Sequence, residues 1–235
     1  MKALLSLLED VLGLVYPNVC LTCGRTLPAG VRTMCPACLY DLPRTEFHKE
    51  QDNPLAMTFW GRVRLEQAAA WFYYFKGSRY PRLIHTIKYA GRKEVGYDLG
   101  RMYAAEIGGS LLARAEVLVP VPLHPRRQRK RGFNQSEWIG RGMAEALQIP
   151  LDHGNLYRAV NTKTQTQKTR LERWQNVEHV FRIRDPHALA GKHILLVDDV
   201  VTTGATVEAC AGVLLGCAGV RVSVAALGYV PSPVG

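Results

Sequence analysis

A buried strand that ends in two carboxylates constrains the fold of this chain more than any other feature. Residues 193–199 are almost wholly aliphatic until the run reaches Asp198 and Asp199. Such a run indicates an inner strand of a parallel sheet, because both of its faces must be buried. A loop rich in Thr and Gly follows at residues 202–206, and residues 207–218 then place apolar side chains at helical spacing. The order of strand, tight loop and helix predicts an α/β fold with a ligand site at the carboxyl end of the strand.

The residue types in this loop suit a phosphorylated sugar. Gly204 permits close approach of the backbone, and the start of the next helix offers N–H groups to a phosphate. Asp198 and Asp199 can accept hydrogen bonds from a ribose diol and can assist a Mg²⁺ shell. The alternatives are an ordinary strand–helix turn and a receiver-type domain, although the latter would not continue into this Thr-rich loop. The candidate binding residues are Asp198, Asp199, Val200, Thr202, Thr203, Gly204, Ala205 and Thr206.

A second predicted strand and helix flank a strongly basic segment. Residues 116–123 indicate a buried strand ended by prolines, and five of the six residues from 126 to 131 are Arg or Lys. Asn134, with Glu137 three positions later, has the form of a helix start. We expect a cationic loop between the two elements that cradles pyrophosphate, and the alternative is a solvated basic turn. The residues expected in this loop are Leu123, His124, Arg131, Gly132, Phe133, Asn134 and Gln135.

Four cysteines near the N-terminus form two closely spaced pairs, Cys20 with Cys23 and Cys35 with Cys38. Four thiolates make a closed tetrahedral zinc site, so we expect a structural ion without a catalytic role. Metal binding contributes on the order of 10 kcal/mol to the folding of small zinc modules, and few apolar residues lie between these pairs. Disulfides are the alternative, which a reducing compartment disfavours.

Charge and hydropathy limit the partners and the location. The 235 residues carry a formal charge of +10, which favours a polyanionic partner such as nucleic acid or a phosphate-rich small molecule. A generally basic surface without a specific partner is the alternative. No stretch is apolar for long enough to span a membrane, and residues 3–16 are expected to form a short amphipathic helix with no secretory cleavage site after it. We therefore expect a cytoplasmic protein.

Several of these motifs together resemble a known family. Residues 195–206 resemble the 5-phosphoribosyl pyrophosphate binding motif of type I phosphoribosyltransferases. That motif, the cysteine pairs, the segment from 119 to 135 and the segment from 85 to 91 together resemble the ComF family of competence-associated, amidophosphoribosyltransferase-like bacterial proteins. The resemblance implies a parallel sheet flanked by helices, as in type I phosphoribosyltransferases, preceded by a small four-cysteine zinc module. It also implies a role in natural transformation, with single-stranded DNA and competence proteins as partners.

The resemblance also assigns roles to further residues. The segment from 158 to 181 matches a mobile loop that closes over the substrate in amidophosphoribosyltransferases, with Thr164, Gln167 and Arg173 as its candidate contacts. Asp198, Asp199 and Arg131 are the candidates for catalysis, which would be mainly electrostatic. His85, His124 and Lys88 are weaker candidates for a general base. The start of the chain lacks a nucleophilic cysteine with a glutaminase domain after it, so a glutamine-dependent amidotransferase is not expected.

The expected organisation has three parts: a helix and zinc knuckle over residues 1–43, a polar link over 44–58, and a phosphoribosyltransferase-like domain over 59–235. Within that domain we expect strands near 67–75, 116–121, 156–160, 180–184, 193–198 and 220–229. We expect helices near 80–89, 95–112, 134–147, 169–177 and 205–217. Alternation of the two predicts a mostly parallel sheet. Two functions fit: a Mg²⁺-dependent phosphoribosyltransferase of unknown acceptor, and a non-catalytic accessory protein that senses 5-phosphoribosyl pyrophosphate or binds DNA.

Overall fold

A four-stranded parallel sheet forms the centre of the computed structural model, which describes residues 18–159 and 180–231. Its order is β1-β6-β5-β2, and every neighbouring pair is parallel. The strands are β1 (Ala68–Tyr73), β2 (Val117–Pro120), β5 (His193–Val201) and β6 (Arg221–Tyr229). The inner strands β5 and β6 bury nearly all of their residues, as a sheet covered on both faces requires. The predicted α/β fold is confirmed.

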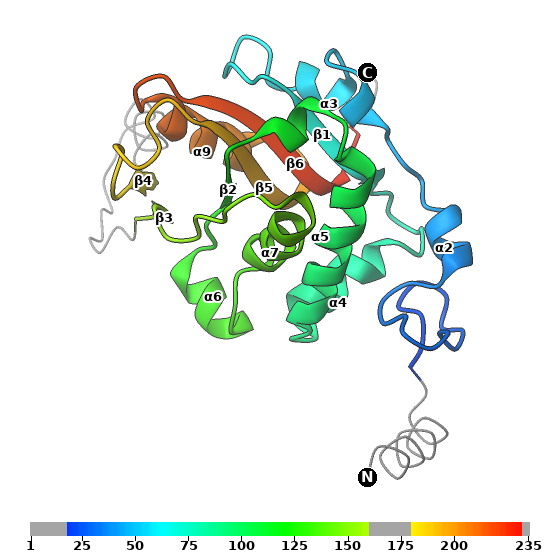
Figure 1. Ribbon diagram of the computed structural model, residues 1–235. Helices are drawn as coiled ribbons and strands as arrows, with labels where there is room; N and C mark the ends of the chain where they lie inside the picture. Colours follow the sequence, from blue (N-terminus) through cyan, green and yellow to red (C-terminus); the bar gives the residue numbers. More distant parts are fainter. Residues whose placement is uncertain (1–17, 160–179, 232–235) are drawn as a thin grey trace, which may run out of the picture.

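Helices cover both faces of this sheet (Figure 1). They are α4 (Pro81–Tyr89), α5 (Lys93–Ile107), α7 (Gln135–Leu147) and α9 (Ala205–Leu215). α5 and α7 pack on one face, while α9 packs on the other (Figure 1). The backbones of α5 and α7 meet at glycines: a Cβ on Gly100 would lie 2.1 Å from the carbonyl oxygen of Ile139, and a Cβ on Gly142 would lie 2.0 Å from that of Tyr97. This close approach fixes the position of α7 over the sheet.

The basic segment that we expected as a loop is a helix, α6 (Pro125–Arg131). The prediction was wrong because the segment carries its own start and stop signals. Pro125 occupies the first turn, and His124 Nδ1 accepts a hydrogen bond from the backbone N–H of Arg126 at 3.1 Å. Gly132 ends the helix with φ +82°. Three basic residues in the last turn also interact favourably with the negative end of the helix dipole.

The strands expected near 156–160 and 180–184 do not belong to the central sheet. β3 (Leu156–Arg158) and β4 (Phe181–Ile183) form a separate antiparallel pair. The expectation of parallel strands was wrong here, because two short strands that run side by side in opposite directions can pair with each other outside the main sheet. The helix expected at 169–177 and the candidate lid residues Thr164, Gln167 and Arg173 lie outside the described residues, as does the helix expected at 3–16.

The chain from Pro36 to β1 carries several short helices. These are α2 (Pro36–Tyr40), η1 (Phe47–Lys49) and α3 (Pro54–Met57), and η2 (Leu111–Arg114) follows α5. Residues 44–58, expected as a polar link, bury Phe47, Asn53 and Leu55. Asn53 caps α3 by accepting from the N–H groups of Leu55 and Ala56, and its amide donates to the Ala68 carbonyl at 2.9 Å. The segment therefore packs directly against the central domain.

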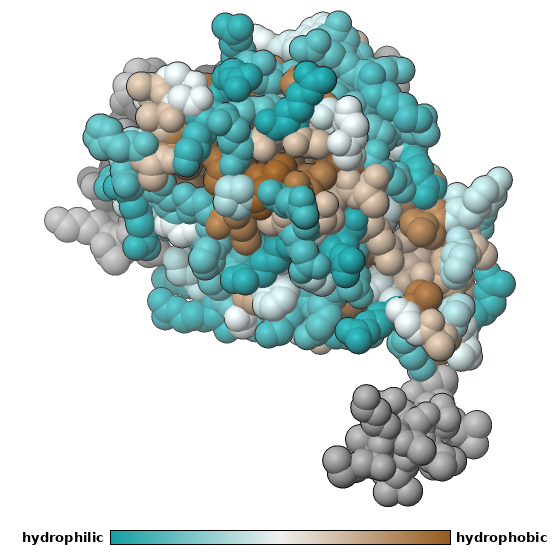
Figure 2. Space-filling view, viewed as in Figure 1, coloured by the Kyte–Doolittle hydropathy of each residue, from teal (hydrophilic) through white to brown (hydrophobic). Residues whose placement is uncertain are grey.

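Polar side chains cover most of the face shown in Figure 2, with apolar residues visible in a central hollow and over the cysteine module. Val19 and Tyr40 are the large apolar residues that this module exposes. No helix within residues 18–159 and 180–231 is both long and apolar enough to cross a bilayer.

Candidate functional site

The two carboxylates at the end of β5 face two different partners. Asp198 Oδ1 accepts from Ser136 Oγ at 2.9 Å and from the backbone N–H of Asp199 at 2.8 Å. Asp199 Oδ1 lies 2.9 Å from Nζ of Lys88, which comes from the last turn of α4. Burial, followed by the negative charge of Asp199, raises the pKa of Asp198 to about 7. The structure therefore places a readily protonated acid beside one that a lysine neutralises.

The loop after this strand leads into the amino end of α9. Gly204 has φ +75° and no side chain caps the helix there. A Cβ at this position would lie 2.8 Å from Cε1 of Phe59, so glycine is required both by conformation and by space. The side chains of Thr202, Thr203 and Thr206 are exposed. The loop thus presents hydroxyls and the first N–H groups of a helix on one surface, a combination that suits an anion.

Arg62, near the start of the expected phosphoribosyltransferase-like domain, supports this loop from outside. Arg62 Nη1 donates to the carbonyl of Thr203 at 3.3 Å, and its guanidinium also pairs with Glu208 on α9. Together with Phe59 against Gly204, this contact holds the loop from the α3 side. Sequence reasoning missed both residues, because neither lies in a motif with a recognisable chemistry.

The second expected anchor meets the first through the start of α7. Asn134 caps α7 by accepting from the N–H of Ser136 at 3.2 Å, and its amide donates to the Val121 carbonyl at 3.0 Å. Ser136 then donates to Asp198. The predicted helix start at Asn134 is confirmed. Sequence reasoning missed Ser136. Its position in the first turn of the helix that starts at Asn134 could have indicated a hydroxyl close to the strand end.

The other residues of the second anchor lie around this junction. Leu123 and Phe133 are half-buried, while Gln135 is buried and its amide nitrogen finds no hydrogen-bond partner within the described residues. Val200, which belongs to the first anchor at the end of β5, is half-buried as well. The guanidinium of Arg131 lies over the ring of Tyr89, 5.4 Å from its centroid, at the end of α4. Tyr89 follows Lys88, so the end of α4 reaches both anchors. α4 and α6 lie below the sheet in Figure 1.

The candidates for a general base have different surroundings. Desolvation, and then the positive charges of Arg158 and Arg126, lower the pKa of His124, whose Nδ1 already accepts from the backbone. His85 is exposed, and its ring is tilted by 49° to the ring of Tyr89, with the centroids 5.3 Å apart. Lys88 is engaged with Asp199. The geometry brings Lys88 to the acid pair and gives neither histidine a described contact with it.

The four N-terminal cysteines lie together as predicted. Their sulfur atoms are all within 4.8 Å of one another, and Cys23 Sγ lies 3.8 Å from Cys35 Sγ. Zn–S bonds of about 2.3 Å in a tetrahedron place neighbouring sulfurs about 3.8 Å apart, so the cluster fits a metal such as zinc. The remaining two cysteines, Cys210 and Cys217, are buried in the core.

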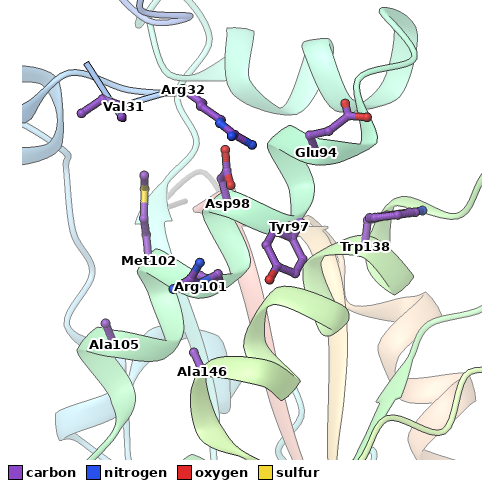
Figure 3. Close-up of a pocket in the computed structure, with 11 residues that line it drawn as sticks. Val31, Arg32, Glu94, Tyr97, Asp98, Arg101, Met102, Ala105, Trp138 and Ala146 are labelled. Atoms are coloured by element: carbon purple, nitrogen blue, oxygen red, sulfur yellow. The ribbon is translucent and has the colours of Figure 1, made fainter. Parts of the chain in front are cut away.

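Polar contacts attach the cysteine module to the central domain. Tyr80 donates its hydroxyl to the carbonyl of Cys38 at 3.2 Å, and Thr33 donates to Asp98 at 2.7 Å. A hollow of about 770 Å³ lies along this junction between the module, α5 and α7. Figure 3 shows Arg32 extending from the module towards Asp98. Neither Asp198 nor Asp199 lines this hollow. A smaller cavity of about 270 Å³ is lined by residues of the second anchor, among them Leu123 and Asn134.

Comparison with known proteins relates this geometry to a family. Residues 126–234 match the model of the phosphoribosyl transferase domain. The chain is 32% identical over 221 residues to the DNA utilization protein YhgH of Escherichia coli strain K12, covering 90% of this chain and 91% of that protein. It is 40% identical over 99 residues to competence protein ComFC of Bacillus subtilis strain 168, covering 42% of this chain and 38% of that one. The chain belongs to the ComF family.

Among solved structures, this ComF chain is similar to the allosteric regulatory enzyme of purine biosynthesis. The identity is 23% and the TM-score 0.39, with 55% of this chain and 25% of that chain covered. The resemblance to ComF and the phosphoribosyltransferase type of fold expected from the sequence are both confirmed.

Proposed function

We propose that this ComF protein binds 5-phosphoribosyl pyrophosphate with Mg²⁺ at the acid pair and the start of α9. The observation that carries the proposal is the junction of β5, α7 and α9. There, two carboxylates stand next to a glycine-permitted loop and an uncapped helix start. Carboxylates at a strand end suit the hydroxyls of a ribose, and the helix start suits a terminal phosphate. The ribose and its phosphate would thus be held by adjacent elements.

Arg131 and the start of α7 are the proposed contacts for the pyrophosphate. Arg131 offers a forked guanidinium, and Gln135 offers a buried amide donor. Carboxylate oxygens also suit Mg²⁺, but Asp198 is engaged by Ser136 and Asp199 by Lys88. These residues do not make a cage of their own, so the ion would enter with the ligand, whose pyrophosphate oxygens complete its shell.

Turnover would be mainly electrostatic. Arg131 would stabilise the leaving pyrophosphate, and Asp198 and Asp199 would hold the ribose as positive charge builds at its anomeric carbon. The lid segment over 158–181, with Thr164, Gln167 and Arg173, remains a proposed closure over this ligand. A non-catalytic sensor would use the same contacts without release of pyrophosphate.

Two measurements test the pocket and the turnover separately. Addition of 5-phosphoribosyl pyrophosphate with Mg²⁺ should raise the melting temperature, and Asp198→Asn/Asp199→Asn should abolish that ligand-dependent rise while Asp52→Asn, an exposed carboxylate, retains it. An absent shift at saturating ligand would refute the pocket. Release of pyrophosphate on addition of nucleobases or amines would show an enzyme, and a blank across a broad panel would favour the sensor.

We also propose that the protein supports natural transformation in the cytoplasm by contact with single-stranded DNA. The supporting observation is α6, on which Arg126, Arg127, Arg129 and Lys130 are all exposed. A labelled single strand should bind with an affinity that falls steeply with salt, and Arg127→Ala/Lys130→Ala should flatten that slope. Arg221→Ala, an exposed arginine at the amino end of β6, is the matched control. Absence of binding at low salt would refute this role.

Three aromatic residues, Phe72, Tyr80 and Tyr89, differ in exposure, which decides whether they could stack on a base. Phe72 and Tyr80 are buried and belong to the core. Tyr89 is 70% exposed and lies beside Arg131, so it is the member of this set that remains a stacking candidate.

We propose a structural zinc ion in the cysteine cluster. The fit of the sulfur positions to a tetrahedral site supports it, as does the small number of apolar residues in the module. Measurement of one zinc per chain, lost in Cys38→Ser and kept in Cys210→Ser, tests the assignment. The division of the chain at residues 43 and 58 also stays a prediction.

A further inference from the structure

The contact between Lys88 and Asp199 is unusual for a lysine at a helix end. Its Nζ lies 2.9 Å from the carboxylate, and the two side chains are only 23% and 12% exposed. A lysine in the last turn normally extends into solvent, where it interacts with the helix dipole and keeps its rotamer freedom. Here that freedom is given up and the ammonium is partly desolvated, so the carboxylate must supply a compensating attraction.

The packing of α4 explains why the ammonium reaches this position. Leu83, Ile84 and Ile87 are fully buried and hold one face of the helix against the core. Lys88 follows Ile87 and lies at the border of that face, so its stem runs along the protein towards the end of β5. The position is therefore built into the helix and does not depend on a mobile surface chain.

The surroundings of the acid pair make this cation the principal positive charge beside it. Asp198 is engaged by neutral donors, Ser136 and a backbone N–H, while Lys88 neutralises Asp199. Arg131 lies at the same end of α4 but is placed over Tyr89. A ligand with hydroxyls for Asp199 and phosphate oxygens for an ammonium could separate this pair, because it offers a partner to both sides at once.

We propose that Lys88 is an exchangeable counter-ion that gates this site for ligands carrying both a vicinal diol and a pyrophosphate. In the ligand-free protein the ammonium occupies Asp199 and keeps free divalent cations from collecting there. On binding, the ammonium moves to the phosphate oxygens, and Asp199 is released to accept from the ribose hydroxyls. The inference rests on the proposed 5-phosphoribosyl pyrophosphate site and names Lys88 as its positioning and specificity residue.

The test compares Lys88→Met, which keeps the stem and removes the charge, with Lys88→Arg and with Lys76→Met, an exposed lysine as control. Free Mn²⁺, a spectroscopic substitute for Mg²⁺, is titrated without other ligand and followed by its electron paramagnetic resonance signal. The wild type and Lys76→Met should bind no Mn²⁺ at this site. Lys88→Met should gain one Mn²⁺ site that disappears again in Lys88→Met/Asp199→Asn.

A second titration uses 5-phosphoribosyl pyrophosphate with Mg²⁺. Its affinity should fall at least tenfold in Lys88→Met, whereas Lys88→Arg should stay close to wild type. Equal Mn²⁺ binding by wild type and Lys88→Met, or an unchanged ligand affinity in Lys88→Met, would overturn the inference. If Lys88→Met does not fold, both titrations are carried out with Lys88→Gln, which also removes the charge. Failure of the wild type to bind the ligand would instead refute the proposed function, and the Mn²⁺ arm would still decide the role of the ion pair.

Discussion

Asp198 should lower the stability of the ligand-free protein at neutral and alkaline pH. Its pKa is raised from 3.8 to about 7 by burial and by the charge of Asp199. The folded protein therefore holds a proton that the unfolded chain has lost between these two pH values, and the free energy of unfolding falls as the pH rises through this window. Below about pH 4 the carboxyl is protonated in both states and the effect disappears.

The magnitude follows from the shift. About three pKa units correspond to roughly 4 kcal/mol as an upper limit. Asp198 is partly exposed, so solvent screening reduces this, and we expect about 2 kcal/mol at pH 8. Asp198→Asn removes the charge, while its amide oxygen can still accept from Ser136 and from the N–H of Asp199. The variant should therefore be more stable than the wild type, with a melting temperature higher by about 4–8 °C for a chain of this size.

Denaturant unfolding of both proteins at pH 5 and pH 8, without ligand, measures this difference. The gain of Asp198→Asn should be clear at pH 8 and much smaller at pH 5, and Asp52→Asn should show no such gain at either pH. The reasoning is refuted if Asp198→Asn is no more stable than the wild type at pH 8, or if its gain is the same at both pH values. A confirmed gain would mark Asp198 as a residue kept for binding at the expense of stability.

Three further outcomes are expected. Gly204→Ala should lower stability by roughly 1–3 kcal/mol and weaken ligand binding, because the added Cβ would lie 2.8 Å from Phe59 in a left-handed backbone; unchanged melting would contradict this. Burial lowers the pKa of His193, so the unfolded chain takes up a proton at a higher pH than the folded protein does. The free energy of unfolding should therefore fall as the pH drops below about 6.5. His193→Gln should make this fall shallower when it is measured by urea unfolding. If the cysteine cluster holds the proposed zinc ion, a chelator should lower the melting temperature of the wild type, whereas Cys38→Ser should start lower and respond little.

The strand–loop–helix unit was predictable because its signal is local. The aliphatic run of β5 needs burial on both faces, and Gly204 and the helix after it fix the geometry of the loop. The strand at β2 and the start of α7 at Asn134 were predictable for the same reason. The four cysteines were predictable as a cluster from their spacing alone.

The misplaced elements either carried local signals that were outweighed or were too short to carry any. α6 was taken for a loop because its charges outweighed its caps, Pro125 and Gly132, in the interpretation. β3 and β4 are three residues each, too short for periodicity to reveal an antiparallel pair. Phe59, Arg62 and Ser136 reach the site only through tertiary packing.

One short helix, α4, connects the cysteine module to the acid pair at the end of β5. Tyr80, the residue directly before α4, donates its hydroxyl to the carbonyl of Cys38, and eight residues later the end of the helix supplies Lys88 to Asp199. A defect caused by Cys38→Ser would therefore combine two lesions, loss of the proposed zinc ion and displacement of the ammonium from the acids. Genetic studies can separate them with Tyr80→Phe, which breaks the tether while every thiol stays in place.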